Sequence, residues 1–247
     1  MSHVALRRRL LAEFVGTAAL VTAVVGSGIM ATTLSPHEVG LQLLENSTAT
    51  ALALGALILT FGPVSGAHFN PIVSAADWFL GRRAGTGLTA TELAGYAAAQ
   101  TVGAIAGSVL ANLMFALAPV TFSHHARDAG HLWLGEVVAT AGLLMLIFAL
   151  ARSGRTAVAP AAVGAYIGAA YWFTSSTSFA NPAVTVGRAF TDTFAGIAPA
   201  SIPGFVLAQF AGLLVGTDLP GGGIAEGQRV DDGEASRVAE RGVHPGP

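Results

Sequence analysis

Two stretches decide the fold of this chain, PVSGAHFNPIVSAADW (residues 63–78) and SSTSFANPAVTVGRAF (residues 175–190), and they read almost the same. Each contains an Asn-Pro pair, which begins at Asn70 in the first and at Asn181 in the second. Asparagine is a favoured N-cap residue and proline is favoured at the first helical position, so each pair predicts the start of a helix. Ten residues of helix span about 15 Å, which is about half of a 30 Å hydrocarbon core.

The composition places the chain in a lipid bilayer. Of its 247 residues, 53% are hydrophobic and only 11% are charged, whereas soluble domains carry about 25% charged residues. A net charge of −2 argues against nucleic acid as a main partner. The absence of cysteine excludes disulfides, thiol catalysis and cysteine-based metal sites. We expect neither a cofactor nor a metal.

Six segments are long and apolar enough to cross a membrane. Two further apolar segments, 70–80 and 181–190, are too short to cross, and each begins with Asn-Pro. The first apolar run exceeds the 7–15 residues of a signal peptide and contains Glu13, so we interpret it as a first span. The predicted spans lie near residues 10–31, 44–62, 92–114, 132–150, 157–175 and 202–218.

The two halves of the chain resemble each other. Glu136 in GEVVATAGLL aligns with Glu13 in AEFVGTAALV, and Gln209 in FVLAQFAGLLVG aligns with Gln100 in YAAAQTVGAIAG. Three spans per half is an odd number, so the second half must be inserted upside down, as an inverted repeat. The arginines agree with cytoplasmic N and C termini: this topology places Arg7, Arg8, Arg9, Arg82, Arg83, Arg152 and Arg155 inside, and Arg127 and Arg188 outside.

These features predict an all-α membrane protein with six transmembrane helices, two re-entrant half-helices and an inverted internal repeat. Residues 1–9 would be a cytoplasmic N-terminus. The membrane domain would cover 10–217, with repeat one at about 10–114 and repeat two at about 132–217. Residues 218–247 are rich in glycine and charge, which predicts a disordered cytoplasmic tail.

The chemistry follows from the place where the two half-helices meet. Each helix N-terminus carries about half a positive charge, so two that meet at the midplane form a barrier to cations and protons. The asparagine side-chain oxygen caps its own helix, which leaves the amide NH₂ free to donate to a solute. Two such donors across a narrow pore suit a neutral hydrogen-bond acceptor, such as water or a small polyol.

With these motifs, residues 10–217 resemble the aquaporin and glyceroporin family, the major intrinsic proteins. The resemblance implies six tilted helices, two half-helices, an hourglass pore in each subunit and a homotetramer in the cell membrane (inner or plasma membrane). It makes Glu13 and Glu136 supports of the loops before the half-helices, and gives His68 a part in both supporting the loop and lining the pore. The pore motif comprises Asn70, Pro71, Ile72, Asn181, Pro182 and Ala183.

Gln100 and Gln209 also match family positions. Hydrogen bonds between helices explain them at least as well as a role in the pore does.

The sequence departs from the family pattern in both motifs. Ile72 replaces the usual alanine, and we expect its bulk to change the packing where the half-helices meet. Val184 stands where the family usually has an arginine that narrows the outer filter and repels cations. Arg188 lies one turn further along and about 40° off that direction. We expect Arg188 to contact a lipid headgroup or an acidic partner rather than to replace the missing arginine.

The resemblance also places the rest of the filter. Counting along the second and fifth spans puts Thr50 where water-selective members have a bulky aromatic residue, and Tyr171 where they have histidine. Ser178 would contribute a loop carbonyl. The predicted selectivity filter is therefore Thr50, Tyr171, Ser178 and Val184, uncharged and wider than a water filter.

The leading hypothesis is a passive channel for small neutral solutes, which are water, glycerol, urea and uncharged metalloid acids such as arsenite, with protons and ions excluded. A water-only channel is the alternative. A coupled secondary transporter is a weaker one, because such proteins usually carry an acidic residue or ion site at the midplane. The spans hold almost no acid–base candidates, so we expect no enzyme. An outer-loop cluster matches no familiar metal site: His124, His125, Asp128 and His131.

Overall fold

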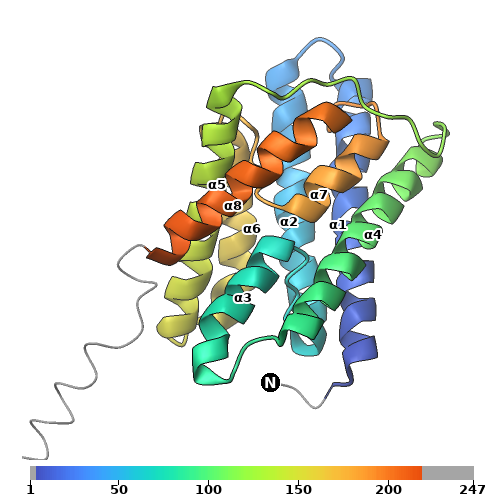
Figure 1. The fold of residues 1–247 in the computed structure, drawn as a ribbon. Coiled ribbons are helices and arrows are strands. Elements are labelled where there is room, and N and C mark those ends of the chain that lie inside the picture. The colour runs from blue at the N-terminus through green and yellow to red at the C-terminus, as the bar shows by residue number, and fades with distance from the viewer. Residues whose placement is uncertain (1–3, 219–247) are drawn as a thin grey trace, which may run out of the picture.

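The computed structural model describes residues 4–218, and these residues form helices without any strand (Figure 1). Residues 1–3 and 219–247 lie outside the described part, so the predicted tail lies there except for Asp218, which ends α8. Within it, six helices are long and apolar enough to cross a membrane. They are α1 (Leu6–Leu34), α2 (Val39–Ser65), α4 (Ala90–Met114), α5 (Gly130–Arg152), α6 (Ala159–Phe173, after a 3-10 turn at Thr156–Val158) and α8 (Ile202–Asp218, after a 3-10 turn at Pro199–Ser201).

The six predicted spans are these six helices, with differences at their ends. α2 begins at Val39 rather than near residue 44, because the segment LQLL at residues 41–44 consists of good helix formers and outweighs Gly40. α1 begins at Leu6, since the arginines before the apolar run also favour helix. The apolar run therefore located each helix, and the residues at its polar ends set the helix length.

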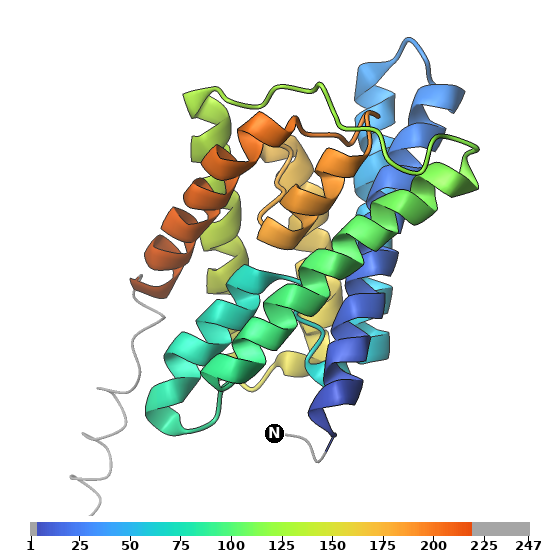
Figure 2. The ribbon, with the colours of Figure 1, turned by 45° about the vertical axis from the view of Figure 1, so that its right-hand side comes forward.

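Two half-helices complete the fold. α3 (Pro71–Ala84) and α7 (Pro182–Gly187, continued by a 3-10 turn at Arg188–Phe190) enter from opposite sides, and their N-termini approach each other in the middle (Figures 1 and 2). α3 runs beyond the predicted end at residue 80 and stops at Gly85, which adopts a left-handed conformation (φ 68°).

The helix contacts show the inverted repeat. α1 packs against α4 and α2, and in the second half α5 packs against α8 and α6. The halves meet where α2 packs on α6, and each half-helix also touches the last long helix of the other half. The predicted fold class is therefore confirmed.

Glycines permit the closest helix crossings. A Cβ on Gly103 of α4 would collide with the backbone carbonyl of Phe14 in α1. The equivalent Gly212 of α8 faces α5 at Val137 and Thr140, where a Cβ would also be too close. Small residues let helix backbones approach in this way inside membranes.

A long segment, residues 115–129, joins the two halves across one face of the molecule, over the C-terminal end of α7 (Figure 2). The N–H of Ser123 donates to the Ala189 carbonyl at 3.0 Å, and the N–H of Thr121 donates to that of Phe190 at 3.3 Å. This segment therefore fixes the C-terminal end of the half-helix.

Candidate functional site

Each asparagine caps its half-helix. The Oδ1 atom of Asn70 accepts from the N–H of Ile72 at 2.9 Å. The Oδ1 atom of Asn181 accepts from the N–H groups of Ala183 at 3.0 Å and Val184 at 3.2 Å. Both asparagines have extended backbones, as an N-cap residue requires. The capping predicted from the sequence is therefore what the structure shows.

The asparagine amides also bind the two halves to each other. Nδ2 of Asn70 donates to the carbonyl of Ala180, and Nδ2 of Asn181 donates to the carbonyl of Phe69, both at 2.7 Å. We expected the whole NH₂ to be free for solute, and this expectation was wrong. Because an amide nitrogen carries two protons, one of them remains for a solute on each side.

Glu13 holds the loop before α3 although its side chain has no exposed surface. One carboxylate oxygen accepts from Ser65 Oγ at 2.6 Å and from the N–H of His68 at 3.0 Å. The other accepts from the N–H of Phe69 and from Gln100 Nε2, both at 2.7 Å. These donors compensate a charge whose burial would otherwise be costly.

Glu136 does the same for the loop before α7, and it too is fully buried. It accepts from the N–H groups of Phe179 at 2.8 Å and Ala180 at 2.7 Å, and from Gln209 Nε2 at 2.6 Å. Gln209 and its equivalent Gln100 are both fully buried in these networks. The glutamines therefore support the loops and do not line the pore.

Both loops contain residues in the left-handed region. Ala67 (φ 50°) and Phe69 (φ 49°) in the first loop correspond to Ser178 (φ 52°) and Ala180 (φ 47°) in the second. Non-glycine residues pay about 1–2 kcal/mol each for this conformation. The glutamates bind N–H groups within or beside these turns, so they hold a backbone shape that the loop alone would not keep.

A cavity of about 280 Å³ runs between the half-helices and the surrounding helices, and most of its wall is apolar. Residues of both strained loops border it, and irregular backbone at membrane depth is tolerated beside a cavity of this kind. Asn70 and Asn181 line it. So do the four predicted filter residues, Thr50, Tyr171, Ser178 and Val184.

The four predicted filter residues bring few polar side-chain atoms. Thr50 Oγ1 lies 3.3 Å from the hydroxyl of Tyr171, so these two groups share a hydrogen bond across the cavity wall. Ser178 Oγ is buried and has no partner among the described residues.

Other motif residues lie away from the cavity. Ile72 is fully buried in a cluster with Ala76 and Leu144, against α5, rather than between the half-helix tips. The expectation that its bulk acts where the half-helices meet was therefore wrong. Pro71, Pro182 and Ala183 are likewise not among the cavity-lining residues. His68 does line the cavity, and its Nδ1 lies 3.0 Å from Ser74 Oγ.

Arg188 is the largest difference from the sequence analysis. It is only 2% exposed, and it borders the cavity instead of reaching a lipid headgroup. Its Nε donates to the Ala195 carbonyl, and its guanidinium carbon lies 3.4 Å from the centre of the Phe179 ring. The signal was available, because residues four apart on a helix share a face and Val184 is four residues earlier.

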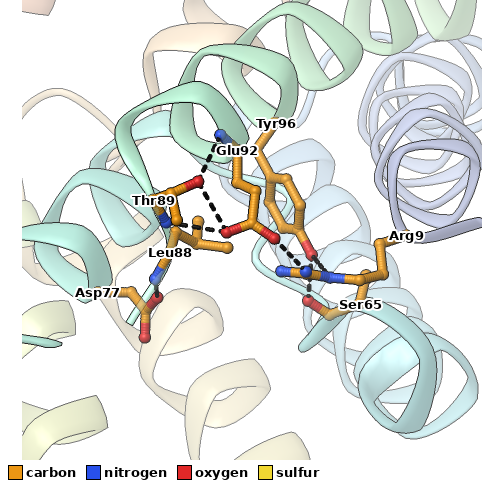
Figure 3. A network of polar contacts seen from close by, with 7 residues as sticks. All are labelled: Arg9, Ser65, Asp77, Leu88, Thr89, Glu92 and Tyr96. Atoms are coloured by element: carbon orange, nitrogen blue, oxygen red, sulfur yellow. Dashed lines mark hydrogen bonds and ion pairs between the residues drawn. The ribbon is translucent and has the colours of Figure 1, made fainter. Parts of the chain in front are cut away.

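A polar network below the first loop was also missed (Figure 3). Arg9 pairs with Glu92 at 2.6 Å and donates from Nε to the Tyr96 hydroxyl at 2.9 Å. That hydroxyl donates to the carbonyl of Ser65 at 2.8 Å. Since the Ser65 side chain binds Glu13, the network connects the ends of three helices to the loop that carries Asn70.

Comparison with known proteins settles the family. The sequence profile described as "Major intrinsic protein" matches residues 1–180. The chain belongs to the major intrinsic protein family. It is 50% identical over 212 residues to the "Aquaglyceroporin AqpS" of Rhizobium meliloti, which covers 86% of this chain and 88% of that relative. It is 34% identical over 250 residues to the "Glycerol uptake facilitator protein" of Pseudomonas aeruginosa, covering 86% of each.

Solved structures agree with this family fold. The aquaglyceroporin from Plasmodium falciparum matches with a TM-score of 0.65 and 20% identity, covering 86% of this chain and 93% of that one. At this identity the likeness supports the fold alone.

Among the described residues, no three His, Asp or Glu side chains are grouped to hold a metal ion.

Proposed function

We propose that the protein is a passive channel for small neutral solutes. The observation that carries this is the pair of asparagine amides beside the cavity, each fixed at a half-helix N-terminus by a cap and by a bond to the opposite loop. Each keeps one proton for a solute oxygen, and the two positive helix ends oppose cations and protons.

We propose that the solutes include glycerol, urea and uncharged metalloid acids as well as water. Val184 and Thr50 are smaller than the residues of a water filter, and the cavity wall around them is mostly apolar. The names of the two relatives, an aquaglyceroporin and a glycerol uptake facilitator, support a polyol-sized pore.

One contact favours the narrower alternative, a water-only channel. The hydrogen bond between Thr50 and Tyr171 draws two filter side chains together. With this bond in place, Tyr171 rather than Val184 sets the width of the pore.

Stopped-flow light scattering on proteoliposomes tests the proposal, with water, glycerol and an uncharged metalloid acid as solutes. We expect the unmodified protein to pass all three. Val184→Arg should block the two larger solutes and spare water, because it adds a long side chain to the filter. Val184→Leu is the control for bulk without charge. Passage of water alone by the unmodified protein would contradict the wide filter and point to Tyr171.

A further inference from the structure

The inverted repeat places two opposite charges at equivalent positions of the pore. Asp77 lies seven residues after Asn70, and Arg188 lies seven residues after Asn181. Both residues border the cavity, as do the equivalent valines one turn before them, Val73 and Val184. Because α3 and α7 run in opposite directions from the centre, the acid and the base lie towards opposite ends of the cavity.

Arg188 makes the outer end positive. Among the described residues it forms no ion pair with a carboxylate, and a guanidinium stays protonated in proteins. A second cation, Arg127, lies with its guanidinium carbon 5.1 Å from the same Phe179 ring and donates to the Gly196 carbonyl at 3.0 Å. The positive charge of this region is therefore built into the fold.

The nearest acid in sequence is occupied elsewhere. Asp192 accepts from the N–H of His124, and its other oxygen lies 2.9 Å from the ring Nδ1. The backbone N–H and the ring of His124 lower the pKa of the Asp192 carboxyl, so it stays ionised at neutral pH, at the exposed surface.

Asp77 makes the inner end negative. It is the one acidic residue among the described residues that line the cavity. Its Oδ2 accepts from the N–H of Leu88 at 2.8 Å. Asp77 takes part in none of the ion pairs among residues 4–218, so its negative charge has no cationic partner there. The nearby Arg82 lies instead over the rings of Trp78 and Phe79.

We infer that Arg188 and Asp77 are two charge barriers in series, one against cations at the outer end and one against anions at the inner end. This rests on the proposed channel function. The half-helix ends repel cations but attract anions, so a pore with this centre and a wide filter needs a separate barrier to anions. Asp77 supplies it, and Arg188 supplies the cation barrier that Val184 does not.

A structural role for each residue makes a different prediction. Asp77 and Arg188 each bind a loop backbone group, so a purely structural role predicts that their variants lose stability and all flux together. The electrostatic role predicts that ions enter while neutral flux stays the same. Asp77→Asn separates the two roles most cleanly, because asparagine keeps an acceptor for the N–H of Leu88 and loses the charge. Arg188→Gln also removes a charge, but its shorter side chain gives up the contact with Phe179 as well, so its glycerol flux and stability are measured beside its ion current.

The test combines planar-bilayer recording in a potassium chloride gradient with glycerol flux in proteoliposomes. We expect the unmodified protein to carry no current. Asp77→Asn should conduct at least tenfold above that background, with a reversal potential near that of chloride. Arg188→Gln alone should also conduct, with a reversal potential that lies nearer to that of potassium. Glycerol flux should stay within twofold. Asp77→Glu should remain non-conducting, and Arg82→Gln is the matched loss of charge away from the cavity.

The outcomes are distinguishable. Non-conducting Asp77→Asn and Arg188→Gln channels with normal glycerol flux would overturn the inference and leave the channel function intact. If Asp77→Asn fails to fold, Asp77→Ser in the same recording decides, and a silent, folded Asp77→Ser would likewise overturn it. An unmodified protein that passes no neutral solute would contradict the proposed function instead, whatever the ion currents are.

Discussion

Glu13 shows how a charged residue is used inside a membrane protein. Its carboxylate is fully buried and accepts from a serine hydroxyl, two backbone N–H groups and a glutamine amide. The loop it holds contains left-handed residues that need external support. The charge is therefore part of the scaffold that points Asn70 at the cavity, rather than a group that meets the solute.

Glu13→Ala should lower stability and glycerol flux together. It leaves the N–H groups of His68 and Phe69 without their acceptor, and each unpaired buried group costs about 1–3 kcal/mol. We expect a lower midpoint of thermal unfolding in detergent and slower glycerol entry into proteoliposomes. Glu38→Ala is the control, because Glu38 is exposed and its side chain makes no capping bond. Equal midpoints for the two variants would contradict the supporting role.

Residue roles could be predicted where the same residue occurs at the equivalent position of both halves. The paired glutamates and the Asn-Pro caps were recognised because each occurs twice in the same order. Single residues were harder. The direction of Arg188 depends on the Ala195 carbonyl and the Phe179 ring, and Arg9 meets Tyr96 across 87 residues of sequence. The spacing from Val184 indicates the face on which Arg188 lies, but neither set of contacts leaves a periodic pattern from which the partners could be predicted.

At the scale of elements, the structure depends on close helix crossings. α4 meets α1 at Gly103, and α8 meets α5 at Gly212, which is the equivalent place in the second half. Apolar run length predicted which segments are helices. It could not predict their ends, since helix propensity at the polar flanks and the left-handed Gly85 decide where they start and stop.

Gly103→Ala should destabilise the protein, although alanine favours helix. The added Cβ would collide with the Phe14 carbonyl, and both are backbone-anchored, so the helices must move apart. Overpacking of this kind costs about 1–3 kcal/mol. Gly40→Ala is the matched control, because a Cβ on this exposed glycine of α2 meets nothing within 4 Å. In detergent, the midpoint of thermal unfolding should fall for Gly103→Ala and should stay the same or rise for Gly40→Ala. A Gly103→Ala midpoint at or above that of the unmodified protein would contradict the close crossing.

At the scale of the whole molecule, the inverted repeat was predictable because three spans per half is an odd number. The hydrogen bonds that attach the two halves to each other were not predictable. From the sequence, both asparagine amides were expected to be free, whereas each donates one proton to the opposite loop. Such a bond depends on how two half-helices face each other in space, which a count of spans does not contain. The filter role of the four cavity-lining residues stays a prediction.

Membrane orientation can be measured cleanly because the chain has no cysteine. We predict that Ala126→Cys, in the exposed segment between α4 and α5, reacts with a membrane-impermeant maleimide added to intact cells. Ser153→Cys, in the exposed turn after α5, should react only after the membrane is opened. The reverse pattern would place both termini outside and contradict the orientation predicted from the arginines.

The bonds from each asparagine to the opposite loop also make each half of the chain depend on the other. One half alone, in one orientation, would leave its asparagine proton and the carbonyl before it without partners at membrane depth. Two copies satisfy both groups only when one is inverted, as the present halves are. Each half therefore carries a donor and an acceptor that only the other half, turned over, satisfies, so neither half is a complete unit at membrane depth. The symmetry does not extend to charge, because position 77 holds an acid where the equivalent position 188 holds a base.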